Sequence, residues 1–411
     1  MKKWVVLLLT GICVALTGCG AFVPDGTKTV ITVGDDKASL SALQTMVRYQ
    51  QAVSYDYYKQ MSQMFGQSVD KKLSFWEPNM DEESKKQELD RQKKSGLIMP
   101  KMDVKTYGDQ MVMNTAVTLA GYMTASEQAD TYHVSLTDDE KSQIENLAKE
   151  FLDKSDKSLL ENTAITEQSV KEYLSYYTLQ DKVYDKYVAE SDVTVSEEES
   201  ECMTISYMCF RLDESNSDAN TDEKVKKQAE DYMKSLHGID FTMLDFKQAA
   251  AELSSNASGG TESIALHDKE EAYVFDKSDM DVIKGLNAGA LYGDVLKGKD
   301  QNYYVIRMDN PTDAEASAKY RDELKRSRID EAFAKQLAIW MKEEGVSYDV
   351  ELLEQIDVND TVIYTGTKQD ASMDIQQDIT AGQDVAAEQE KENKQESKEI
   401  SAEKSEDRQN K

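Results

Sequence analysis

The chain has 411 residues, of which 39% are hydrophobic and 31% are charged. This length allows two or three domains, each with its own hydrophobic core. The formal net charge of −30 argues against nucleic-acid binding, because contacts to phosphates need clustered Lys and Arg side chains. A strongly acidic surface suits an exported protein that has to stay soluble at high local concentration.

The N-terminus has the pattern of an export signal. Lys2 and Lys3 precede the apolar stretch WVVLLLTGICVAL, which is too short to span a bilayer comfortably. The following LTGC resembles the lipobox of bacterial lipoproteins, which implies that residues 1–18 are removed and that Cys19 is lipidated. Acyl chains on Cys19, at roughly 0.8 kcal/mol per buried CH₂, would make the lipid bilayer a permanent partner. An ordinary secretory signal with a chance cysteine is the alternative.

The remaining cysteines and the histidines predict neither a disulfide nor a metal site. Cys202 and Cys209 fall in one extended stretch, so they lie roughly 23 Å apart at about 3.3 Å per residue. A disulfide needs Cα atoms within about 7 Å, and we therefore expect two free, buried thiols. The histidines are scattered without ligand spacing, and no metal or cofactor is expected. The three histidines are His133, His237 and His267.

Residues 19–200 are predicted to form a mainly helical region. It opens with a short strand and a turn in TVITVGDDKAS, and a helix follows from the capping residue Ser39 or Ser41. Further along, Thr137 and Glu140 have the spacing of a capping box at the start of a helix. A stripe of tyrosine and aliphatic side chains in ITEQSVKEYLSYYTLQDKVYDKYV indicates a helix-packing face rather than a binding face.

Three further segments flank or interrupt this helical region. A polar insertion near residues 66–104 carries dense charge of both signs, and we expect a mobile helical hairpin or loop there. Residues 311–365 show apolar side chains at helical spacing, as expected for a long helix that packs on the N-terminal region. Residues 366–411 have almost no aromatic side chains and are predicted to form a disordered acidic tail.

Residues 201–310 have the pattern of a compact α+β unit of ordinary domain size. CMTISYMCFRL has strand propensity and KVKKQAEDYMKSL is a helix; a short strand around SIALHD, a helix around MDVIKGL and the closing strand NYYVIRM follow. The predicted fold class is therefore α+β. A mainly helical domain, built from N-terminal helices and a returning C-terminal helix, contains an inserted α+β domain.

The order of these segments resembles the foldase lipoproteins of the PrsA and SurA type, in which a parvulin peptidyl-prolyl isomerase domain is inserted into a helical chaperone domain. VSLTDDE, ITEQSVKEYL and VTVSEEES are similar to the helix starts that precede the isomerase domain in this family. TISYMCF, GIDFTMLDFKQAAAELSSNASGG, GLNAGAL and NYYVIRM are similar to its first strand, its helix with a glycine-pair loop, its Leu-x-x-Gly turn and its last strand. The resemblance covers nearly the whole mature chain except the insertion and the tail.

The resemblance also marks the candidate site. Parvulins carry histidines in the first and last strands and an Asp or Cys before the glycine pair, where this chain has Tyr207, Tyr304 and Asn256. These are the candidate catalytic residues, and Met280 and Ile283 are the candidate substrate-binding residues. Isomerisation of an X-Pro bond needs an apolar slot and polar groups that fit the twisted amide, but no nucleophile. Tyrosine can donate such a hydrogen bond, or the two rings can merely fill the space of a histidine pair.

Two functions follow from the resemblance. The first is a membrane-anchored extracytoplasmic folding factor, on the outer face of a bacterial cell membrane, that binds unfolded or partly folded exported proteins and has parvulin-type isomerase activity. The alternative is a non-catalytic holdase with a degenerate parvulin domain, which the two tyrosines and the Met-rich helices favour. Pairing of the chain as a homodimer stays open. A solute-binding lipoprotein is disfavoured, because the sequence lacks the alternating strands and helices of two α/β lobes.

Overall fold

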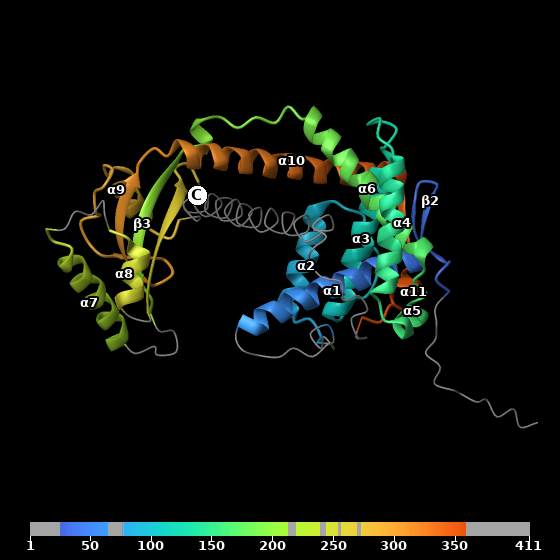
Figure 1. The fold of residues 1–411 in the computed structure, drawn as a ribbon, viewed down its shortest axis with the longest axis horizontal. Coiled ribbons are helices and arrows are strands. Elements are labelled where there is room, and N and C mark those ends of the chain that lie inside the picture. Colours follow the sequence, from blue (N-terminus) through green and yellow to red (C-terminus); the bar gives the residue numbers. More distant parts are fainter. Residues whose placement is uncertain are drawn as a thin grey trace, which may run out of the picture. The chain divides into compact units, whose positions relative to one another are not determined.

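The structure, a computed structural model, describes residues 25–64, 76, 78–212, 219–238, 244–253, 256–268 and 273–358. Cys19, the predicted signal and the predicted tail lie outside these residues. The chain forms two compact units: unit 1 consists of Met1–Glu190 and Ala332–Lys411, and unit 2 of Ser191–Glu331 (Figure 1). Unit 2 is thus inserted into the chain of unit 1.

Unit 1 is mainly helical, and its helices share one hydrophobic core. Leu43 of the first helix, Leu119 of the third and Tyr173 of the sixth are among the fully buried side chains that meet there. The helices that lie wholly within unit 1 are α1 (Leu40–Met64), α2 (Glu82–Ser95), α3 (Tyr107–Glu127), α4 (Asp138–Asp153), α5 (Lys157–Thr163), α6 (Glu167–Glu190) and α11 (Val350–Leu353).

A small antiparallel sheet joins the two chain segments of unit 1. Its order is β2 (Asp36–Ser39), β1 (Thr29–Val33) and β7 (Val346–Tyr348). The strand β7 follows the long helix α10 (Ala314–Glu344), whose last residues pack in unit 1. The predicted return of the C-terminal helix to the N-terminal helices is therefore confirmed.

Part of the predicted polar insertion is a single helix, α2, which is fixed to α3. Glu88 on α2 is 6% exposed, and its carboxylate accepts hydrogen bonds from Arg91 (2.6 Å) and from Gln110 of α3 (2.6 Å). Burial opposes the charge of Glu88, but the hydrogen bonds from Gln92, Arg91 and Gln110 together hold its pKa below the ordinary value. This satisfied carboxylate explains how a highly charged helix can dock on an apolar neighbour.

Unit 2 is built on a four-stranded antiparallel sheet with the order β4-β3-β6-β5. The insertion was predicted at 201–310; unit 2 is wider at both ends and includes the first part of α10. The strands are β3 (Cys202–Phe210), β4 (Ala257–Ala265), β5 (Leu296–Lys297) and β6 (Tyr303–Asn310), and the helices within unit 2 are α7 (Ala219–Ser235), α8 (Phe246–Leu253) and α9 (Lys277–Lys284).

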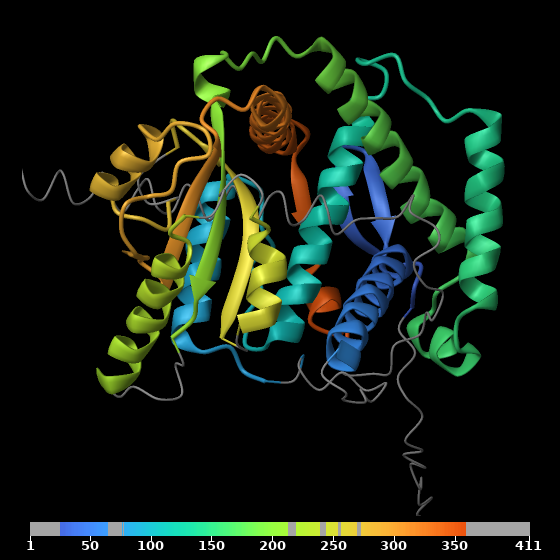
Figure 2. The same cartoon turned by 60° about the vertical axis from the view of Figure 1, so that its left-hand side comes forward.

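The two faces of this sheet are covered differently, as Figure 2 helps to follow. On one face, Met208 and Val305 pack with α7 and α8. On the other face, Ile205 and Ile306 pack with Met280 of α9. Because side chains alternate along a strand, Tyr207 and Cys209 share the face of Ile205. They lie toward the end of β3, where this face is hollowed into a pocket.

Candidate functional site

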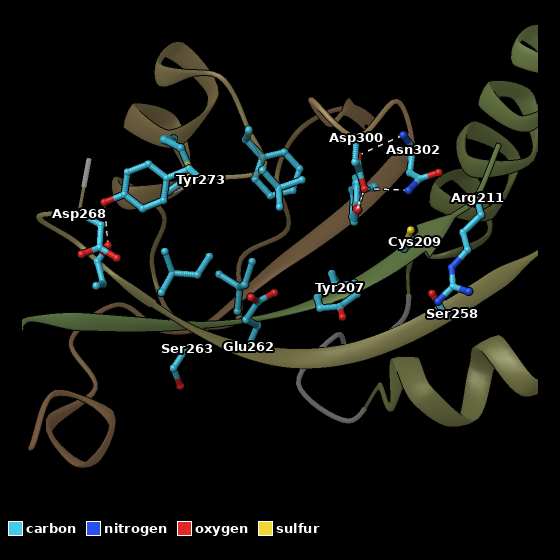
Figure 3. A pocket seen from close by; sticks show the side chains of 17 residues that line it. Tyr207, Cys209, Arg211, Ser258, Glu262, Ser263, Asp268, Tyr273, Asp300 and Asn302 are labelled. Atoms are coloured by element: carbon cyan, nitrogen blue, oxygen red, sulfur yellow. Dashed lines mark hydrogen bonds between the residues drawn. The ribbon is translucent and has the colours of Figure 1, made fainter. Parts of the chain in front are cut away.

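A pocket of about 400 Å³ lies on the α9 face of the sheet in unit 2 (Figure 3). Strands β3, β4 and β6 provide its floor, and the segment before α9 provides much of its apolar wall. No histidine lies among the described residues that line it. They are Ile205, Tyr207, Cys209, Arg211, Ser258, Glu262, Ser263, Ile264, Ala265, Asp268, Tyr273, Val274, Phe275, Met280, Asp300, Asn302 and Tyr304.

Tyr207 lies across a glycine of the neighbouring strand. It pairs with Gly260 of β4, and a Cβ atom on Gly260 would stand 3.0 Å from the Tyr207 hydroxyl oxygen. The preceding Gly259 serves the opposite face, where a Cβ atom would stand only 2.0 Å from the carbonyl oxygen of Phe246 in α8. The glycine pair therefore lets a ring lie over one face of β4 and a helix backbone approach the other.

Tyr304 faces Tyr207 across the pocket floor, with the ring centroids 6.0 Å apart and the planes at 65°. Its ring also packs edge-on against Phe275, at a centroid distance of 5.1 Å. The Tyr304 hydroxyl donates a hydrogen bond to Asp300 Oδ2 (2.5 Å). Burial, and then this hydrogen bond, raise the pKa of Tyr304 above its ordinary value. The phenol is thus neutral at physiological pH, and its hydroxyl group is already engaged as a donor to Asp300.

The hydroxyl of Tyr207 is placed differently. It has no hydrogen-bond partner within the described part of the chain, so it can donate to a bound molecule. Burial, and then the negative charge of Glu262, raise the pKa of Tyr207. Tyr207 is therefore a neutral donor at the edge of an apolar surface.

The pocket is suited to binding rather than to nucleophilic chemistry. Burial raises the pKa of the Cys209 thiol, which disfavours the reactive thiolate. The described residues contain no group of three or more His, Cys, Asp or Glu placed to hold a metal ion. What remains is a slot with walls such as Ile205, Phe275 and Met280 and a free phenolic donor beside it.

The structure brings together three of the five residues predicted for the site. Tyr207, Tyr304 and Met280 all line the pocket. Ile283 is fully buried in the core behind the pocket and does not line it. Asn256 is also outside the lining, because its side-chain amide donates to Gln228 of α7 (3.1 Å).

Sequence reasoning missed several lining residues. Cys209 could have been found by the two-residue period of β3, which places it beside Tyr207. Phe275 and Asp300 lie outside the helices and strands, and no periodic signal marks them. The predicted state of the cysteines is confirmed, since Cys202 and Cys209 are both free and buried.

No protein-family model and no curated protein sequence matches the chain. Among solved structures it is similar to the peptidylprolyl isomerase PrsA from Bacillus anthracis, with 16% identity and a TM-score of 0.25 over 56% of this chain and 99% of that one. It is similar to the foldase PrsA from Lactococcus lactis, with 15% identity and a TM-score of 0.28 over 80% and 98%. It is also similar to a SurA-like chaperone from Campylobacter jejuni, with 13% identity and a TM-score of 0.21 over 62% and 98%.

These structures are of the PrsA and SurA type that the sequence motifs resemble. At such low identities and TM-scores the likeness says nothing about activity, so the function has to be inferred from the pocket. In the part of the chain that the structure describes, no helix is long and apolar enough to cross a membrane.

Proposed function

We propose that this protein is an extracytoplasmic folding factor whose pocket in unit 2 binds apolar, proline-containing segments of exported proteins. The observation that carries the proposal is the pocket itself, which joins apolar walls to one free phenolic donor, Tyr207. A volume of about 400 Å³ suits one or two side chains of an extended polypeptide. Such a pocket recognises exposed apolar side chains, which unfolded proteins present and folded proteins bury.

The proposed chemistry is cis-trans isomerisation of the bound X-Pro bond. Its barrier of about 18–20 kcal/mol reflects the amide resonance that is lost in the twisted state. In that state the prolyl nitrogen becomes a better hydrogen-bond acceptor, and the Tyr207 hydroxyl, which has no partner among the described residues, would donate to it. The rings of Phe275 and Tyr304 would hold the proline and exclude water, which strengthens the hydrogen bond.

The proposed location is the outer face of a bacterial cell membrane, where lipid on Cys19 would anchor the chain. The support is the export signal and the LTGC segment in the sequence. A tethered folding factor meets its clients as they emerge from the membrane, while they are still unfolded.

A proline-peptide isomerisation assay on the full-length chain tests the proposal. Wild type is expected to accelerate isomerisation, and Tyr207→Phe to lose about a hundredfold of that acceleration, as removal of one positioned donor does elsewhere. Tyr303→Phe is the matched control, because Tyr303 lies on the other face of the sheet and donates to Asp222. Equal rates for wild type and Tyr207→Phe would remove Tyr207 from the mechanism.

A non-catalytic holdase is the second candidate, and one observation favours it. The Tyr304 hydroxyl already donates to Asp300. Among the described residues, the pocket therefore offers the phenol of Tyr207 as an unengaged donor, where a parvulin has two histidines. Wild type that keeps an unfolded client soluble without accelerating isomerisation would select this candidate. A gain of isomerase activity in Tyr304→His would then show that the slot is intact and that only the donor is missing.

A further inference from the structure

The pocket lining carries an excess of negative charge. Three carboxylates, on Glu262, Asp268 and Asp300, line it together with one guanidinium, on Arg211, among the described residues. Figure 3 places Asp268 at one end and Arg211 at the other, with Glu262 between them beside Tyr207. This excess favours a bound molecule that carries positive charge over a neutral or negative one.

Of the three lining carboxylates, that of Glu262 is the one without a partner among the described residues. It pairs in register with Ile205 on the edge strand β4 and shares the pocket face of the sheet. It makes no ion pair or hydrogen bond within the described residues. Asp268, by contrast, accepts a hydrogen bond from Tyr320 (2.5 Å), and Asp300 accepts one from Tyr304.

Among the described residues, the cations near the pocket are engaged elsewhere or lie at its far end. The ammonium group of Lys284 donates to the Leu266 carbonyl (2.6 Å) and lies 4.8 Å from the centre of the Tyr273 ring. Arg211 lies beyond Cys209, on the Asp300 side in Figure 3. Within the described residues the exposed carboxylate of Glu262 therefore has no cation beside it, and a positively charged group of a bound molecule can pair with it.

We propose that the pocket prefers client segments with a lysine or arginine close to the apolar or prolyl residue that it binds, and that Glu262 selects this cation. The inference rests on the proposed function, because it names the clients of the same pocket. In an extended client, the residue two positions away points to the same side, roughly 7 Å along the chain. A lysine or arginine there reaches Glu262 while the apolar side chain packs against the rings of Phe275 and Tyr304. The net charge of −30 would steer such clients toward the protein.

The test measures the binding of three labelled hexapeptides to the full-length chain by fluorescence anisotropy. The peptides Ala-Lys-Phe-Pro-Lys-Ala, Ala-Ala-Phe-Pro-Ala-Ala and Ala-Glu-Phe-Pro-Glu-Ala differ only at the second and fifth positions, which are positive, neutral or negative. We expect the lysine peptide to bind best and the glutamate peptide worst, with about a tenfold difference between them in dilute buffer. High salt should reduce this difference, because the charges are accessible to solvent.

Two charge-reversal variants distinguish the effect of the carboxylate in the pocket from the effect of the net charge of the protein. Glu262→Lys should reverse the ranking of the lysine and glutamate peptides. Glu252→Lys makes the same change in net charge on an exposed position of α8, across the sheet from the pocket, and should keep the wild-type ranking. Glu262→Gln, which keeps the shape of the side chain, should bring the two affinities together.

The outcomes distinguish the two proposals. Equal binding of all three peptides to wild type, or a reversal by both lysine variants, would overturn the role of Glu262 while the pocket stays a binding site. Failure of every peptide to bind, with a client still kept soluble, would overturn the proposed function of the pocket itself.

Discussion

Tyr207 and Tyr304 have the same side chain and lie on adjacent strands, but their hydroxyl groups are in different states. The Tyr304 hydroxyl donates a hydrogen bond to Asp300, whereas Tyr207 lies over Gly260 with its hydroxyl unbonded within the described residues. The difference arises from the neighbours: Tyr304 has a carboxylate four residues before it, and Tyr207 has a bare glycine backbone beside it. The proposed role of hydrogen-bond donor therefore falls to Tyr207, while Tyr304 forms part of the pocket wall.

The glycine pair gives a matched test at the residue scale. Gly259→Ala should lower the free energy of unfolding of unit 2 by about 1–3 kcal/mol, because its methyl group would overlap the backbone of Phe246. Gly260→Ala should cost less than about 1 kcal/mol, since the Tyr207 ring can shift by a few tenths of an ångström. Urea unfolding followed by a unit 2 signal measures both.

Peptide binding should rank the same two variants in the opposite order. Gly260→Ala displaces the Tyr207 ring and should weaken peptide binding, while Gly259→Ala, where it is still folded, should bind as wild type does. Equal stability losses in the two variants would contradict the described packing of β4 between α8 and Tyr207.

Among the elements, those with local signals were predicted well. The Thr137 and Glu140 capping box forms as expected, with both reciprocal hydrogen bonds present at the start of α4. The strands around Tyr207 and Tyr304 were found from their composition. The docking of α2 on α3 was not, because it depends on a hydrogen bond from Gln110 to Glu88, which no local pattern reveals.

A group of carboxylates where three elements of unit 1 meet predicts a pH dependence of stability. Burial, and then the charge of Asp36 in the β1–β2 hairpin, raise the pKa of Glu127 at the end of α3 to about 7; Glu344 of α10 adds to this. A raised carboxyl pKa favours the folded state fully below about pH 4.5, and this contribution is lost as the pH rises toward 7.

Urea unfolding of unit 1 at pH 5.5 and pH 8 measures this contribution. Wild type should lose on the order of 1 kcal/mol between the two values, since Glu127 is only partly buried and solvent screens the charges. Glu127→Gln should remove most of that difference. The same pH dependence in Glu127→Gln would contradict the assignment of the effect to Glu127.

For the whole molecule, the order of the segments along the chain was predictable from the sequence. The pairing of strands from the two ends of the chain was not. The spacing of apolar residues predicts the helical region, the α+β insertion and the returning helix. The resemblance of the sequence motifs to a known order of segments points to the same arrangement. The pairing of Val33 with Val346 across the whole chain has no sequence signal of its own. For the site, the strands and Tyr207 were predicted, but the apolar wall at Phe275 comes from a segment whose position only the folded chain defines.

Site-specific photo-crosslinking tests the central claim, that the pocket of unit 2 binds unfolded polypeptide, most directly. A benzophenone side chain would replace Val274, which lines the pocket and is 40% exposed, or Val282 on α9, which is 51% exposed and outside the lining. The client is reduced, carboxymethylated α-lactalbumin, which cannot fold. Strong crosslinking from position 274 and weak crosslinking from position 282 is the predicted result. Equal crosslinking from both positions, or none from position 274 while the client is bound, would contradict the account.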